Sequence, residues 1–214
     1  TPVVASGVCL DLLGTGEWNA TANLSTLNDG TITATLSHAD AAGNTGSGVR
    51  AFVKDTLIPT LSIASPASLA TYNATTYTTL AISGACNKSG ATVALTGDVS
   101  GTTSTTCNGT NYSFSGLTLT GANGVRSVTA KISDTAGNQT QASVNLQKDI
   151  LVPTLAITEP ASMTTYNAAN YQSLAITGTC NKSGATVALT GDVSGTTSAN
   201  CDGTNFAFSG LTLT

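Results

Sequence analysis

The sequence predicts an all-β protein made of tandem copies of one small sandwich domain, and three observations support this. The chain repeats itself at an offset of 94 residues, since Asp55–Leu61 returns as Asp149–Leu155 (149 − 55 = 94). Apolar and polar residues alternate over short runs such as 80–86 and 142–146, which is the period of a strand with one buried face. Glycine and asparagine cluster between the runs, where turns need positive φ. A period of this size indicates similar modules in a linear array.

The complete repeat begins with a first strand that carries two prolines, which edge positions tolerate. Alternating runs then predict further strands, and these cover 80–86, 93–95, 112–114, 128–132 and 142–146. Turns are expected at Asn87–Gly90, Asn108–Gly109 and Gly121–Gly124, and Asp134–Asn138 is expected to join the last two strands as a hairpin. About seven strands in roughly 95 residues match the size of an immunoglobulin-like sandwich.

The repeat boundaries divide the chain into three parts. Residues 55–148 form one complete domain, 1–54 the C-terminal part of a preceding domain, and 149–214 the N-terminal part of a third. The numbered chain is therefore expected to be a window on a longer polypeptide or a subunit whose broken ends complete each other head to tail. The window is favoured, because donated ends would bring Cys180, which already has Cys201, and leave Cys9 without a mate.

The composition narrows the range of partners. Charged residues make up 8 % of the chain and the net charge is −4, whereas soluble domains usually carry about 25 % charged residues. Only seven basic residues are present, and they are scattered, which argues against nucleic acid as a partner. No apolar run approaches the ~20 residues that span a bilayer. The expected partners are neighbouring repeats or copies of the same chain, and host or cell-surface glycans.

The cysteines are spaced regularly. Each repeat places two of them 21 residues apart (107 − 86 and 201 − 180), so Cys86 is expected to pair with Cys107, and Cys180 with Cys201. A disulfide closing such a loop contributes about 3 kcal/mol and indicates an extracellular, oxidising compartment. A reduced pair of small buried thiols is the alternative. Cys9 lies near the position of Cys107 once a four-residue insertion before Trp18 is allowed (18 − 9 against 112 − 107), so its partner is expected before Thr1.

Two motifs recur in register and carry a resemblance. A linker of the form Lys-Asp-x-x-x-Pro-Thr-Leu occurs at 54–61 and 148–155, and an Asp-x-Ala-Gly-Asn hairpin occurs at 40–44 and 134–138. Together they resemble the bacterial Ig-like tandem repeats of large surface adhesins, over the whole chain in two partial copies and one full copy. The resemblance implies a row of Ig-like sandwiches on a cell surface, and calcium sites occur in parts of that family.

Catalysis is not expected. The only histidine is His38, whose counterpart one period on is Ile132, and it falls on the same strand side as Leu36. A partly buried structural histidine is therefore the preferred interpretation. The many hydroxyl side chains have no histidine in a complete module to activate them. The sequence thus favours a protein that is not an enzyme.

One metal hypothesis follows from the topology. In an Ig-like sandwich the incoming chain and the loop between the last two strands share a pole, which brings Asp55 and Asp134 together, with Asn87 nearby. Calcium binds six or more oxygens, several of them carboxylates, so these three residues are candidate calcium ligands at the domain junction. The alternatives are that Lys54 or Lys88 neutralises the carboxylates, and that Asp134 caps its own hairpin.

Sugar binding is a further hypothesis. Four tyrosines recur in the loop after the first strand, and aromatic faces stack on sugar rings. They are Tyr72, Tyr77, Tyr166 and Tyr171. Packing over the end of the sandwich is the preferred alternative.

The function predicted from these patterns is a structural repeat segment, the stalk or filament body of an extracellular fibre or cell-surface adhesin. One alternative is that the modules bind glycans or host proteins directly. Others are a self-assembling filament subunit with head-to-tail domain complementation and a spacer attached to a secreted hydrolase.

Overall fold

Every regular element in the computed structural model is a β-strand, and the structure describes residues 21–214. The all-β class is therefore confirmed for the described residues. The chain divides into two units, Thr1–Lys148 and Asp149–Thr214. The first unit contains β1 (Gly30–Ala39), β2 (Thr45–Lys54), β3 (Thr71–Tyr72), β4 (Leu80–Ala85), β5 (Thr92–Gly97), β6 (Val99–Ser100), β7 (Ser104–Thr106), β8 (Asn111–Leu119), β9 (Gly124–Ser133) and β10 (Gln139–Lys148). The second contains β11 (Leu155–Glu159), β12 (Leu174–Cys180), β13 (Thr186–Ala188), β14 (Val193–Ser194), β15 (Ser198–Asn200) and β16 (Asn205–Leu213).

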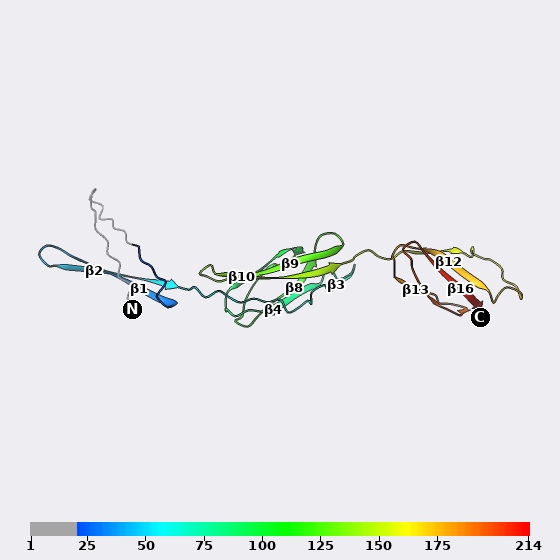
Figure 1. Ribbon diagram of the computed structural model, residues 1–214, viewed down its shortest axis with the longest axis horizontal. Coiled ribbons are helices and arrows are strands. Elements are labelled where there is room, and N and C mark those ends of the chain that lie inside the picture. Colours follow the sequence, from blue (N-terminus) through cyan, green and yellow to red (C-terminus); the bar gives the residue numbers. More distant parts are fainter. Residues whose placement is uncertain (1–20) are drawn as a thin grey trace. The chain divides into compact units, whose positions relative to one another are not determined.

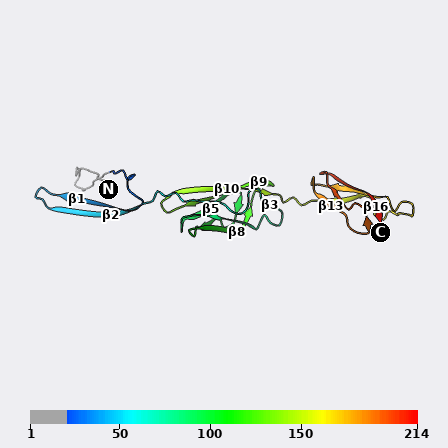
Figure 2. The same ribbon diagram turned by 60° about the horizontal axis from the view of Figure 1, so that its bottom comes forward.

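The middle module, residues 55–148, is built from two sheets (Figures 1 and 2). One sheet has the strand order β3-β10-β9-β5-β7 and the other β4-β8-β6. The module thus has eight strands, where the sequence predicts about seven. The predicted first strand is reduced to two isolated bridges, Leu61 to Cys86 and Ser65 to Ser83.

The core lies between these sheets because alternate residues of each strand point inward. β4 and the second half of β9 show the alternation most clearly, with every second residue buried. A glycine is required at position 84, where a Cβ would lie 1.8 Å from the Ser62 carbonyl oxygen and 2.9 Å from the Tyr112 ring. Tyr112 uses this space to donate its hydroxyl to the Ser62 carbonyl at 3.0 Å.

The hairpin before the middle module is a two-stranded sheet of β1 and β2 with an unbroken register from Gly30–Lys54 to Ala39–Thr45. Among the described residues no second sheet covers it, so its side chains are exposed apart from the half-buried Ile32 and Lys54. His38 is therefore exposed, and the expectation of partial burial is wrong.

The second unit repeats the pattern of the middle module. Its sheets have the orders β11-β12-β16-β14 and β13-β15. The predicted first strand is a regular strand here, because β11 pairs with β12. A cluster of eight buried side chains forms the core, with Phe206 and Phe208 in edge-to-face contact at 5.8 Å.

Both predicted cysteine pairs are joined by disulfides in the structure. Cys86 bonds to Cys107 and Cys180 bonds to Cys201, and all four side chains are buried. Each bond ties the end of β4 or β12 to the turn before β8 or β16. The predictions for Cys9 and Trp18 lie outside the described residues.

Candidate functional site

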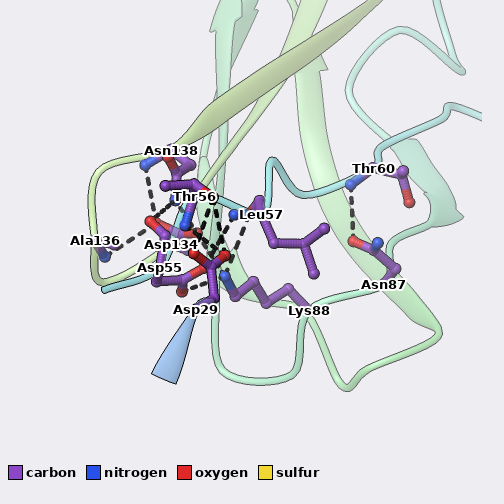
Figure 3. Close-up of polar contacts among 10 residues, drawn as sticks. All are labelled: Asp29, Asp55, Thr56, Leu57, Thr60, Asn87, Lys88, Asp134, Ala136 and Asn138. Atoms are coloured by element: carbon purple, nitrogen blue, oxygen red, sulfur yellow. Dashed lines mark hydrogen bonds and ion pairs between the residues drawn. The ribbon is translucent and has the colours of Figure 1, made fainter. Parts of the chain in front are cut away.

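The predicted convergence of Asp55 and Asp134 occurs around a lysine. The Lys88 Nζ lies 2.5 Å from the Asp55 carboxylate and 2.7 Å from the Asp134 carboxylate, between the linker and the last hairpin (Figure 3). We call these three residues the junction clasp. The Lys88 Nζ also donates to the Leu57 carbonyl at 3.4 Å. The clasp therefore fixes the linker to the module that it enters.

Asp134 has a second role that follows from its place at the start of a tight hairpin. Its Oδ1 accepts the backbone N–H of Ala136 at 3.0 Å and of Asn138 at 2.9 Å, which is the Asx-type turn predicted as an alternative. Asn138 in turn donates its side-chain amide to the Asp55 carbonyl at 2.9 Å. The hairpin thus holds the linker backbone as well as the ammonium group.

Asn87 takes a different role from the one predicted. Its Oδ1 accepts the Thr60 N–H at 2.7 Å, apart from the carboxylates (Figure 3). The second unit makes the same bond between Asn181 and Thr154 at 2.8 Å. The asparagine therefore anchors the start of each module.

The residues present do not fit the calcium hypothesis. Calcium needs six or more oxygen ligands, whereas the two carboxylates here face an ammonium group and the Asn87 oxygen is bonded elsewhere. A cation placed there would face the positive charge of Lys88 at close range. Within residues 21–214 no group of three or more His, Cys, Asp or Glu side chains is arranged to hold a metal.

The clasp shifts the pKa values of Asp134 and Lys88. The hydrogen bond from Lys88 is the main cause that lowers the pKa of Asp134 to about 2, against an ordinary value of 3.8, although burial opposes it. The carboxylates raise the pKa of Lys88, with Asp134 the larger contributor and Asp55 the second. The Asp134 side chain is only 2 % exposed, so losing its partner would leave a charge with little access to water.

The side of the linker that faces β1 and β2 has contacts that sequence reasoning did not identify. Asp29 accepts the Thr56 N–H at 2.8 Å, which is the main cause of its lowered pKa. Lys54 donates to the Leu27 carbonyl. The 94-residue repeat indicates the Lys54 contact, because Lys148 holds the position equivalent to Lys54. Lys148 donates to the Gly121 carbonyl at 2.9 Å.

The second unit carries the matching ion pair on its own linker. Lys182 contacts the Asp149 carboxylate at 2.5 Å and the Leu151 carbonyl at 3.3 Å. Its bond to Asp149 is the main cause that lowers the pKa of that carboxyl. In each pair the lysine follows the aspartate by 33 residues, so the same linker attachment recurs in both units.

The repeated tyrosines mainly pack. Tyr72 and Tyr77 are half-buried against the middle core, and Tyr166 is half-buried against the second core. The Lys148 Nζ lies 4.6 Å from the centroid of the Tyr77 ring. Tyr171 alone is exposed, at 37 %. These rings therefore do not form an exposed aromatic face for sugar stacking.

Comparison with solved structures finds similar chains, one of which is a repeat of an adhesion protein. No family model and no curated protein matches the chain. The chain is similar to the crystal structure of a tetra-tandem repeat in the extending region of a large adhesion protein, with 20 % sequence identity and a TM-score of 0.37. The match covers 93 % of this chain and 53 % of that one, so this chain spans about half of its length. In residues 21–214 there is no helix with the length and apolarity needed to cross a membrane.

Proposed function

We propose that the chain is a structural repeat segment of an extracellular fibre or cell-surface adhesin, built from tandem Ig-like sandwich domains and without catalytic activity. The observation that carries the proposal is the repeated attachment of the linker, by Lys88 to Asp55 and by Lys182 to Asp149. A linker that is bonded to its own module has fewer conformations than a flexible tether. Such a segment is suited to hold a binding region away from a surface.

The disulfides support the extracellular location. Structural disulfides persist in oxidising compartments and are rare in the cytosol. In residues 21–214 each unit has one such bond. The low content of charged residues, 8 %, also suits side-by-side packing of segments, because neighbouring shafts repel each other little.

Small-angle scattering of the full 214-residue chain tests the proposal. A compact globule of this length has a radius of gyration of about 17 Å, and a stalk segment is expected to give roughly twice that value. The double variant Lys88→Met with Lys182→Met removes the lysine ion pair from both linkers and is expected to scatter as a more flexible chain. Lys131→Met on β9 serves as the matched control.

Two results would contradict the stalk function. One is a radius of gyration near that of a compact globule for the unmodified chain. The other is identical flexibility in the double lysine variant and the control, since the linker attachments would then have no mechanical effect.

A further inference from the structure

A shallow depression occurs at the same place in both units, away from the junction clasp. In the middle module it has a volume of about 440 Å³ and lies between the edge strand β7 and the strands β4 and β8. Residues 83–85, 105–106 and 111–113 form most of its wall. In the second unit a depression of about 350 Å³ is lined by residues 177–178 and 205–207, with Asn200 and Asp202. Every lining residue of the second depression lies 94 positions after a lining residue of the first.

Sequence differences between the two units concentrate at this depression. Between residues 55–120 and 149–214, 18 of 66 aligned positions differ. Eight of these differences fall among the ten lining positions of the first depression, which leaves ten among the remaining 56. The wall therefore changes at most of its positions, whereas the other aligned positions change less often.

Exposure alone does not explain this concentration. The segment Cys86–Ser104 contains ten exposed residues, and all of them are identical in Cys180–Ser198. Exposed strand and turn positions thus stay unchanged a few residues away from the depression. Variation concentrated at one concave surface is typical of binding sites with different specificities.

The chemistry of the wall is that of a surface for neutral, hydroxyl-rich ligands. In the middle module the polar lining side chains are hydroxyls and amides with no formal charge. Tyr112 borders the depression as a buried residue and is held in place by its hydroxyl bond to the Ser62 carbonyl. Amides and hydroxyls bond to sugar hydroxyls, while the methyl groups of threonine and alanine contact the C–H groups of a sugar ring.

The wall is also preorganised. The Asn108 Oδ1 accepts the N–H groups of Thr110 and Asn111, at 2.9 and 2.7 Å, so the loop beside the depression is fixed. The disulfide at Cys107 anchors the same loop. Asn111 and its counterpart Asn205 are both asparagine, so each depression has an amide side chain at this position. A rigid wall lowers the entropy cost of binding.

We infer that each depression binds a neutral sugar and that the substitutions between the units give them different preferences. The change from Asn108 to Asp202 places a carboxylate in the second depression. Anionic sugars are therefore disfavoured there more than in the middle module. This binding role is independent of the proposed stalk function.

The test is a titration of the ¹⁵N-labelled full chain, followed by amide chemical shifts. The probes are glucose, galactose, mannose and N-acetylglucosamine, each at about 50 mM, which exceeds a dissociation constant of about 1 mM. Sialic acid serves as the anionic probe, and an extended threonine–valine peptide as a competing ligand class. At least one neutral sugar is expected to shift the resonances of 83–85 and 111–113, or of their counterparts.

Filling the depressions gives the decisive variant. Ser113→Trp combined with Ala207→Trp is expected to weaken sugar binding by at least about tenfold. The matched control is Ser115→Trp with Ser209→Trp, at exposed positions of the same strands outside the wall; it is expected to bind normally. Asp202→Asn is expected to increase the tolerance of the second depression for sialic acid.

Four outcomes overturn the inference: the absence of shifts with every neutral sugar, shifts confined to other surfaces, equal binding by the filled and control variants, and shifts at the wall caused by the peptide alone. The last result would identify β7 and β15 as edges for strand addition. None of these outcomes bears on the scattering test of the stalk function.

Discussion

The segments Cys86–Ser104 and Cys180–Ser198 have identical sequences but different secondary structure. In the middle module this sequence forms the six-residue strand β5, whereas in the second unit it forms the three-residue strand β13. β5 pairs with β9 along all six residues and with β7 on its other side. Among the described residues β13 pairs only with β15. The length of the strand is thus determined by its partner and not by its own residues.

The turn hydrogen bonds beside β5 and β13 are the same in both units, although the two strands differ in length. The Gly90 N–H donates to the Cys107 carbonyl at 2.9 Å, and Gly184 does the same with Cys201. The environment of the core residues changes instead, since Leu95 is 4 % exposed and its counterpart Leu189 is half-buried. The turns and the disulfide depend on sequence nearby, while strand extension and burial depend on the facing sheet.

The largest expected effect tests this comparison directly. Leu95→Ala should destabilise the middle module by about 3 kcal/mol, because the side chain is buried and leaves a cavity. Leu189→Ala should cost the second unit roughly 1 kcal/mol, since part of that side chain is already in water. Urea unfolding with amide resonances of each unit as separate reporters measures both values. Equal losses would show that the difference in burial has no energetic effect.

The next largest effect should be the same in both units. Replacing Cys86 and Cys107 by alanine should lower the stability of the middle module by about 3 kcal/mol, and the pair Cys180 and Cys201 should cost the second unit the same amount. The reason is that both loops have a sequence separation of 21. Thermal unfolding of the two double variants provides the measurement. A clearly unequal loss would imply that packing around the sulfur atoms dominates over loop closure.

A smaller difference is expected for the lysines that hold the linkers. Lys88→Met should destabilise its module more than Lys182→Met destabilises the second unit. The Asp134 carboxylate that loses its partner is 2 % exposed, whereas Asp149 is 35 % exposed and can be hydrated by water. Urea unfolding of both variants checks the order, with Lys131→Met as the reference for removing a positive charge.

The smallest effect is a pH dependence of the middle module. The pKa of Asp134 is lowered to about 2 from an ordinary 3.8, so this carboxylate stabilises the folded state above pH 3.8. That contribution is lost as the pH falls through about 2. Asp134→Asn should flatten the stability profile in this range, and an NMR titration of the Asp134 carboxyl should give the low pKa directly. A normal pKa for Asp134 would contradict the clasp.

Much of the fold could be predicted from the sequence because the relevant patterns are local. Alternation along β4, β9 and β10 predicted strands, and the asparagine–glycine pairs predicted turns. The hairpin at Asp134–Asn138 and both cysteine pairs also follow from spacing and turn chemistry. These features need only a few neighbouring residues.

Other features could not be predicted, because they depend on which strand pairs with a segment or which sheet covers it. Leu61 and Leu155 are the same residue at equivalent positions, yet Leu61 makes an isolated bridge and Leu155 pairs regularly in β11. Alternation placed His38 on an inward face, but exposure depends on a covering sheet. At the junction, the approach of Asp55 and Asp134 was predictable, but their joint neutralisation by Lys88 had to be chosen from several alternatives.

The position of the disulfides has a consequence for a chain under tension. When a module is pulled from its ends and unfolds, the residues enclosed by Cys86 and Cys107 remain in a closed loop, and the force passes through the sulfur atoms. At about 3.4 Å per extended residue, a loop with a sequence separation of 21 withholds about 70 Å of length. Each unit would therefore release less slack than its residue count implies, and reduction of the bond would restore that length as a separate, measurable step.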